Sequence, residues 1–205
     1  MSRIRSICVY CGSASGGDPA FVAAAEELGR AMAAANVRLV YGGGALGLMG
    51  AVARATLDAG GEVTGIIPDF LTQKEKLLDG VQDTIVVPDM HTRKQLMFER
   101  ADAFVALPGG IGTLEELVEQ MTWAQLGRHR KPILVLSLKD FWKPLLTLIA
   151  HMRESGFIRP GFELSYLVAE RVADVIPMLE AAAAHRAPAQ NGEWVAQEKW
   201  IERKF

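Results

Sequence analysis

The sequence has little cysteine, no surplus of positive charge and no long hydrophobic run. Only two of its 205 residues are cysteines, and the formal net charge is −2 at pH 7. A chain without a basic surplus has no general electrostatic attraction for nucleic acids or anionic membranes. No segment is long and apolar enough to span a bilayer, and no signal-peptide pattern precedes the first strand-like run. We therefore predict a cytoplasmic protein with no nucleic-acid or membrane partner.

The few potential metal-binding and redox residues lack the spacing that such sites need. Cys8 and Cys11 have the spacing C-x-x-C, but they lie in a strand-like run and no second cysteine pair accompanies them. We interpret both as small strand residues. The histidines show no metal-binding pattern such as H-E-x-x-H. The sequence therefore predicts no metal site.

Short apolar runs alternate with segments of 3.6-residue periodicity almost to the end of the chain. This alternation is typical of strand–helix units around a parallel sheet. We predict one α/β domain over residues 1–184, a Rossmann-like, doubly wound parallel sheet of about seven strands, followed by a polar C-terminal tail over residues 185–205. The predicted strands are residues 6–10, 38–41, 63–67, 84–87, 103–107, 132–136 and 165–168. The predicted helices are 19–35, 46–59, 92–101, 114–126, 141–155 with Asp140 as N-cap, and 173–184.

A glycine-rich turn after the fifth predicted strand is the most informative stretch. It reads Pro108-Gly109-Gly110-Ile111-Gly112-Thr113, and a helical pattern with two carboxylates in its first turn follows at once. A helix start leaves four backbone N–H groups unpaired and carries a partial positive charge. Glycines without Cβ let an anion approach those groups closely. We predict a phosphate-binding turn with an acidic side chain beside it.

Glu115 and Glu116 both remain candidates for that acidic side chain. Thr113 and Glu116 have capping-box spacing, which gives Glu116 a structural explanation that Glu115 lacks. If the apolar residues of this helix form its buried stripe, Glu115 lies about 100° from Leu114 and Glu116 about 200°, so Glu115 should flank the core and Glu116 should point away from it. This geometry favours Glu115 for substrate contact, although first-turn side chains can reach over the helix end.

Two cations stand at the predicted start of another helix. Thr92 and Gln95 have capping-box spacing, which places Arg93 and Lys94 in the first helical turn. Cations there are disfavoured by roughly 0.3–1 kcal/mol each. We infer a nearby anion such as a phosphate, which the planar guanidinium of Arg93 suits; the alternative is two solvated surface charges.

Two further turns come after predicted strands. Gly42, Gly44 and Gly47 have the spacing G-x-G-x-x-G, and Asp69 stands roughly where a ribose-binding acid belongs, so a non-catalytic or redox dinucleotide-binding protein is an alternative. The turn follows the second strand instead of the first, and its glycines also suit close helix–strand packing. The small-residue loop 11–17 either offers hydroxyl and N–H groups to a ligand or is a simple turn.

Three stretches together resemble the Lonely Guy (LOG) family, whose members are often labelled lysine decarboxylases. They are Gly42-Gly43-Gly44-x-x-Gly47-Leu48-Met49-Gly50, Met90-His91-x-Arg93-Lys94 and Pro108-Gly109-Gly110-x-Gly112-Thr113-Leu114-Glu115-Glu116. The resemblance implies a Rossmann-like homodimer that hydrolyses the N-glycosidic bond of AMP or an N6-substituted AMP. The products are the free base and ribose 5-phosphate, and the reaction needs no metal or cofactor.

The resemblance also implies roles for individual residues. Arg93 and either Glu115 or Glu116 are the implied catalytic residues. The implied substrate-binding residues are Gly43, Gly44, Glu75, Met90, Arg93, Lys94, Gly109, Gly110, Gly112, Thr113 and Thr122. These roles suit the chemistry, because cleavage of the glycosidic bond develops oxocarbenium-like charge that a carboxylate stabilises.

Overall fold

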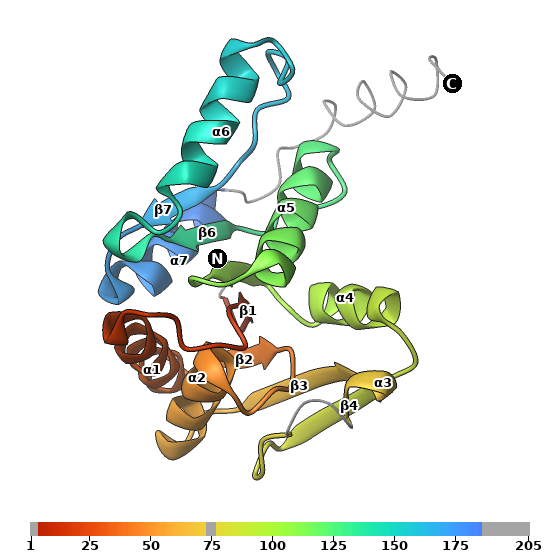
Figure 1. The fold of residues 1–205 in the computed structure, drawn as a ribbon, viewed down its shortest axis with the longest axis vertical. Coiled ribbons are helices and arrows are strands. Elements are labelled where there is room, and N and C mark those ends of the chain that lie inside the picture. Colours follow the sequence, from red (N-terminus) through yellow and green to blue (C-terminus); the bar gives the residue numbers. More distant parts are fainter. Residues whose placement is uncertain (1–3, 73–76, 186–205) are drawn as a thin grey trace.

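One parallel sheet of seven strands forms the centre of the protein. The computed structural model describes residues 4–72 and 77–185. The strands run in the order β4-β3-β2-β1-β5-β6-β7 and pair in parallel throughout, which confirms the predicted doubly wound architecture (Figure 1). Their bounds are β1 Ser6–Tyr10, β2 Arg38–Tyr41, β3 Val63–Pro68, β4 Asp83–Val87, β5 Ala103–Ala106, β6 Ile133–Leu136 and β7 Leu167–Ala169.

Helices cover both faces of this sheet (Figure 1). Helices α1 (Pro19–Ala34), α2 (Gly47–Asp58) and α7 (Val175–His185) pack on one face. Helices α4 (Met90–Glu99), α5 (Ile111–Gln125) and α6 (Lys143–Glu154) lie on the other. Because both faces are covered, β3, β5 and β6 are buried along their whole length, as continuous apolar runs require. None of the helices in the described ranges is long and apolar enough to cross a membrane.

The direction in which successive strands are added to the sheet reverses between β1 and β5, although all the strands stay parallel. From β1 the chain continues to β2 on one side, and it later returns to place β5 on the other side. Ligands of such sheets bind outside the carboxyl ends of the strands at this switch point. The register pairs Tyr10 with Ala106, and the backbone N–H of Gly12 donates to the carbonyl of Pro108 at 3.1 Å. The loop after β1 and the turn after β5 are therefore adjacent.

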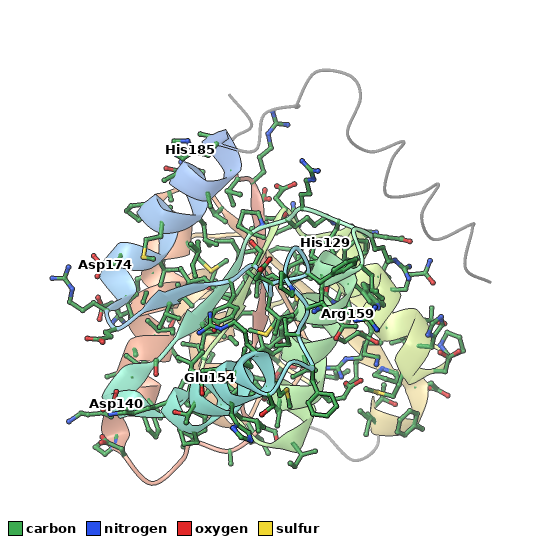
Figure 2. All side chains as sticks on the ribbon, turned by 90° about the horizontal axis from the view of Figure 1, so that it is seen from above. His129, Asp140, Glu154, Arg159, Asp174 and His185 are labelled. Carbon is green, nitrogen blue, oxygen red and sulfur yellow. The ribbon has the colours of Figure 1, made fainter. Side chains whose placement is uncertain are left out.

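The start of α6 differs from the prediction. Asp140, labelled in Figure 2, is not its N-cap. It ends a short 3₁₀ helix, η1 (Leu138–Asp140), with φ of 60°, and Trp142 is the N-cap of α6. Pro144 explains the difference, because proline is accommodated in the first turn of a helix and fixes where that turn begins. Two short elements, α3 (Asp69–Thr72) and the 3₁₀ helix η2 (Val172–Asp174), were not expected as separate units. The predicted tail starts at residue 185, but His185 is the last residue of α7, and residues 186–205 lie outside the described residues.

Candidate active site at the carboxyl edge of the sheet

The turn after β5 ends in an open helix start. Gly110 is the N-cap of α5 and makes no side-chain cap, so Thr113 is the third helical residue and the predicted Thr113 cap is wrong. Within residues 4–72 and 77–185, the backbone N–H groups of Ile111, Gly112 and Thr113 have no acceptor. A Cβ added at Gly110 or Gly112 would meet no atom within 4 Å. The free N–H groups therefore face space that an anion can enter.

A cavity of about 290 Å³ adjoins this turn. The loop 12–16 and the turn 108–110 form its polar part, and Phe21, Leu48 and Phe141 form its apolar part. Prediction from the sequence left the role of the loop open and did not identify the two phenylalanines. Sheet topology is the signal that locates them, because the loops after β1, β5 and β6 meet at one edge.

Arg93 and Glu116 face each other across α4 and α5. The Nη1 atom of Arg93 lies 3.3 Å from Oε1 of Glu116, and the side chains are only 10% and 12% exposed. The Nε–H of Arg93 donates to the carbonyl of Ile66 at 3.1 Å, which fixes the guanidinium at the end of β3. A Cβ at Gly42 would overlap Nη2 of Arg93, so this glycine makes room for the guanidinium beside the end of β2.

The expectation that Glu115 flanks the core and Glu116 points away from it is wrong. The side chain of Glu115 is 51% exposed, whereas Glu116 lies on the buried side of α5. The buried side carries the polar residues Thr113 and Gln120 together with the apolar residues Leu117 and Met121, while Ile111, Val118 and the C-cap Leu126 are exposed. Apolar residues alone therefore do not mark the buried side of this helix, and the predicted orientation of the helix about its axis was wrong.

Burial raises the pKa of Glu116 to about 7. The positive charge of Arg93 acts in the opposite direction, and the neighbouring charge of Glu115 adds to the rise. A carboxyl group with a pKa near neutrality exchanges a proton readily at physiological pH. Glu116 is therefore suited both to stabilise positive charge and to accept a proton from water.

Both cations of α4, Arg93 and Lys94, form ion pairs with carboxylates of the chain itself. Asp89, not Thr92, is the N-cap: its Oδ1 accepts from the backbone N–H of Thr92 at 2.8 Å, so the predicted capping box is wrong. Lys94 Nζ lies 2.6 Å from Oε1 of Glu115 and 2.9 Å from Oε1 of Glu119. Burial opposes the charge of Lys94, but these two partners outweigh it, and the pKa of Lys94 is raised.

The turn after β2 has a different structure. The carbonyl of Gly12 accepts from the backbone N–H groups of Leu48 and Met49, at 3.0 and 3.3 Å, and so occupies the start of α2. A Cβ at Gly47 would overlap the backbone of Ser13, and one at Gly50 would overlap the carbonyl of Ala45. These two glycines serve close packing. The dinucleotide alternative therefore lacks an open helix start at this turn.

The other predicted site residues that the structure describes lie at different distances from the Arg93–Glu116 pair. Met90 lies at the Arg93–Glu116 pair, since its Sδ is 3.9 Å from Nη1 of Arg93, and Gly43 and Gly44 directly follow Gly42 in the turn after β2. Thr122 is exposed and donates to the carbonyl of Val118 at 2.7 Å. It stands nine residues beyond Thr113, about 14 Å along the helix. Glu75 lies outside the described residues.

Cys8 and Cys11 are buried free thiols, and of the two only Cys8 is a strand residue, so the prediction for Cys11 is wrong. Cys8 lies within β1, and Cys11 follows the strand directly. Burial raises the pKa of both thiols, which keeps them protonated and unreactive.

Comparison with known proteins identifies the family of the chain. Residues 49–179 match the family described as "Possible lysine decarboxylase". The probable cytokinin riboside 5'-monophosphate phosphoribohydrolase LOGL2 of rice (Oryza sativa subsp. japonica) is 43% identical over 97% of this chain and 80% of its own length. The chain belongs to the LOG family. Its relatives also include the cytokinin riboside 5'-monophosphate phosphoribohydrolase LOG5 of Arabidopsis thaliana, 41% identical over 99% of this chain and 87% of its own. The cytokinin riboside 5'-monophosphate phosphoribohydrolase of Rhodococcoides fascians is 43% identical over 86% of this chain and 90% of its own.

Solved structures of other proteins share this fold. The molybdenum cofactor carrier protein of Chlamydomonas reinhardtii has a TM-score of 0.66 at 22% identity, over 89% of this chain and 99% of its own. DNA processing protein A of Helicobacter pylori has a TM-score of 0.59 at 15% identity, over 85% of this chain and 79% of its own. At these identities the likeness concerns the fold alone.

Proposed function

We propose that the chain hydrolyses the N-glycosidic bond of AMP or of an N6-substituted AMP, releasing the free base and ribose 5-phosphate. The buried Arg93–Glu116 pair beside the open start of α5 is the observation that carries this proposal. It brings a carboxyl group, a cation and free backbone N–H groups to one edge of the sheet. The curated relatives carry the name of this activity.

The three parts of the site match the three groups of the substrate. The N–H groups at the start of α5 hold the 5′-phosphate, with Gly109, Gly110, Gly112 and Thr113 forming the turn. Glu116, ionised, stabilises the oxocarbenium-like charge on the ribose and then takes a proton from the attacking water. Arg93 donates a hydrogen bond to the leaving purine, which gains electron density as the glycosidic bond breaks. Met90, Gly43 and Gly44 border the space for the base.

Glu115 and Lys94 act in this scheme as neighbours of the reacting pair. Lys94 bridges α4 to α5 through Glu115 and Glu119, and so fixes the distance between the helices that carry Arg93 and Glu116. We assign the catalytic role to Glu116 and leave Glu115 in substrate contact at the rim, where its side chain is exposed. Glu75 keeps its proposed role in substrate binding by resemblance alone.

The position of Thr122 is explained better by a homodimer than by a single chain. It lies about 14 Å along α5 from the phosphate turn, too far for a contact with the same nucleotide. The exposed residues Ile111, Val118 and Leu126 form an apolar stripe on that helix. We propose that a second copy packs on this stripe and brings its own substrate to Thr122. Val118→Glu is expected to give a monomer by analytical ultracentrifugation.

A lysine decarboxylase is the weaker description of the site. That chemistry needs a lysine whose neutral amine condenses with pyridoxal phosphate. Lys94 is the lysine beside the reacting pair, and its two carboxylate partners favour the charged ammonium. Lysine turnover without nucleotide hydrolysis would restore the decarboxylase description.

The direct test is incubation of the purified protein with AMP and, separately, N6-isopentenyl-AMP. Free base and ribose 5-phosphate are followed by chromatography. We expect release from at least one nucleotide, with Arg93→Ala and Glu116→Gln strongly impaired. If both nucleotides stay intact while NAD or NADP binds, the dinucleotide alternative replaces this proposal. The cytoplasmic location and the lack of a nucleic-acid partner stay predictions from the sequence.

A further inference from the structure

The parts of the site follow one another along the carboxyl edge of the sheet. Arg93 contacts the ends of β2 and β3 through Gly42 and Ile66. The open start of α5 lies beyond the end of β5, next to the loop after β1. Phe141 stands after β6, on the far side of the β1–β5 crevice from Arg93. The strand order therefore places the phosphate turn between the reacting pair and Phe141.

Phe141 and Phe21 bound the cavity beyond the phosphate turn. Their rings meet edge to face, with centroids 5.7 Å apart and planes at 76°. Phe141 also packs edge to face against the buried Trp142, which fixes its backbone at the rim of the cavity. Two elements from opposite faces of the sheet, α1 and the segment before α6, thus meet here over its edge.

The cavity offers little to a second negative group. Among the described residues, neither lysine nor arginine lines it; its polar lining is the backbone of the two turns with Ser13 and Ser15. A charged group moved against the apolar side chains of Phe21, Leu48 and Phe141 loses hydration that these side chains do not replace. The negative charge of one phosphate at the helix start is compensated by N–H groups and the helix dipole. A second phosphate would instead face aromatic rings.

We propose that Phe141, with Phe21 behind it, restricts the site to nucleoside monophosphates by closing the cavity to a β-phosphate. This inference rests on the proposed function, because that function orients the nucleotide with its base toward Arg93 and its phosphate toward Phe141. Phe141 is then a specificity-determining residue that has no part in cleaving the bond.

The experiment compares the affinities of AMP and ADP, measured by isothermal titration calorimetry in a Glu116→Gln background so that both nucleotides stay intact. Phe141→Arg places a cation where the β-phosphate would lie, and Phe141→Ser removes the ring without adding charge. Phe141 is 37% exposed, so both replacements fit at the surface, and thermal melts confirm folding. Phe157→Arg is the matched control, since Phe157 is 86% exposed and does not line the cavity.

We expect the parent to prefer AMP strongly. Phe141→Arg should raise the affinity for ADP relative to AMP by about tenfold or more, and Phe141→Ser by less. Phe157→Arg should leave that ratio unchanged. The inference is overturned if the parent binds ADP as well as AMP, if it binds neither, or if Phe141→Arg and Phe157→Arg give the same ratio. A wild-type protein that binds AMP without releasing adenine would contradict the proposed function and still leave this ratio decisive.

Discussion

Two glycine-rich turns follow parallel strands in this protein, and only one of them leaves a helix start open. After β2, the carbonyl of Gly12 occupies the first N–H groups of α2, and Gly47 and Gly50 pack against backbone atoms. After β5, Gly110 and Gly112 border empty space, and the first N–H groups of α5 have no acceptor in the described part of the chain. Glycine spacing alone does not distinguish these cases. What distinguishes them is whether the chain itself provides the acceptor.

The packed turn still contributes to the site, but indirectly. Gly42 makes room for the guanidinium of Arg93, and the hydrogen bonds from α2 to Gly12 hold the loop that forms one wall of the cavity. One turn therefore positions the groups that surround the substrate, and the other is suited to bind it. Changes in the first should affect stability, and changes in the second should affect binding and turnover.

The largest effect is expected from Glu116→Gln, which removes the ionisable group beside the open turn. We expect turnover of AMP or N6-isopentenyl-AMP to fall on the order of 10³-fold, as for loss of a group that stabilises developing charge. Glu115→Gln is the matched control on the adjacent, exposed residue, and should lose less than about tenfold. Steady-state release of free base measures both. Equal losses of turnover in the two variants would contradict the assignment of the catalytic role to Glu116.

Gly50→Ala should chiefly destabilise the protein. The added Cβ overlaps the carbonyl of Ala45, a backbone atom that cannot move aside without distorting the turn. We expect a loss of about 2–3 kcal/mol in the free energy of unfolding, typical of overpacking. Urea denaturation followed by circular dichroism measures it. A variant as stable as the wild type would show that the turn after β2 is not held by packing.

Much of the fold, but less of the site, is predictable from the sequence. The bounds of β1 and β2 agree with the prediction, because buried parallel strands are continuous apolar runs. Helix starts were misplaced where the chain uses Asp89 and Gly110 as N-caps instead of the nearby threonines. Capping-box spacing alone did not identify either cap.

The orientation of Glu116 was not predictable from hydrophobic periodicity. That method assumes that the buried side of a helix is apolar, but α5 buries the polar residues Thr113, Glu116 and Gln120 beside Leu117 and Met121. The cavity wall was missed for another reason. Phe21 and Phe141 come from segments far apart in the sequence, and only the strand order brings them together.

Gly112→Ala tests the open turn, and it should change the stability of the protein in the opposite direction from Gly50→Ala. No atom lies within 4 Å of the added Cβ, and alanine is the better helix former, so the free energy of unfolding should rise by about 0.5 kcal/mol. The same Cβ occupies the space through which a phosphate approaches the N–H groups. We expect the affinity for AMP to fall about tenfold, or about 1.4 kcal/mol, by calorimetry. Unchanged affinity would place the phosphate elsewhere.

The smallest effect is the pH dependence that the buried carboxyl group imposes. Burial raises the pKa of Glu116 to about 7, so the ionised form that the reaction needs increases as the pH rises through neutrality. We expect kcat/KM to be about fourfold lower at pH 6.5 than at pH 8. The phosphate of the substrate also titrates, near pH 6, so variants are needed to assign the change. Glu115→Gln should keep the rise near pH 7 and Glu116→Gln should lose it. A rise that persists without the Glu116 carboxyl group would assign the titration to the substrate. It would then contradict the assignment of Glu116 as the titrating acidic group beside the open turn.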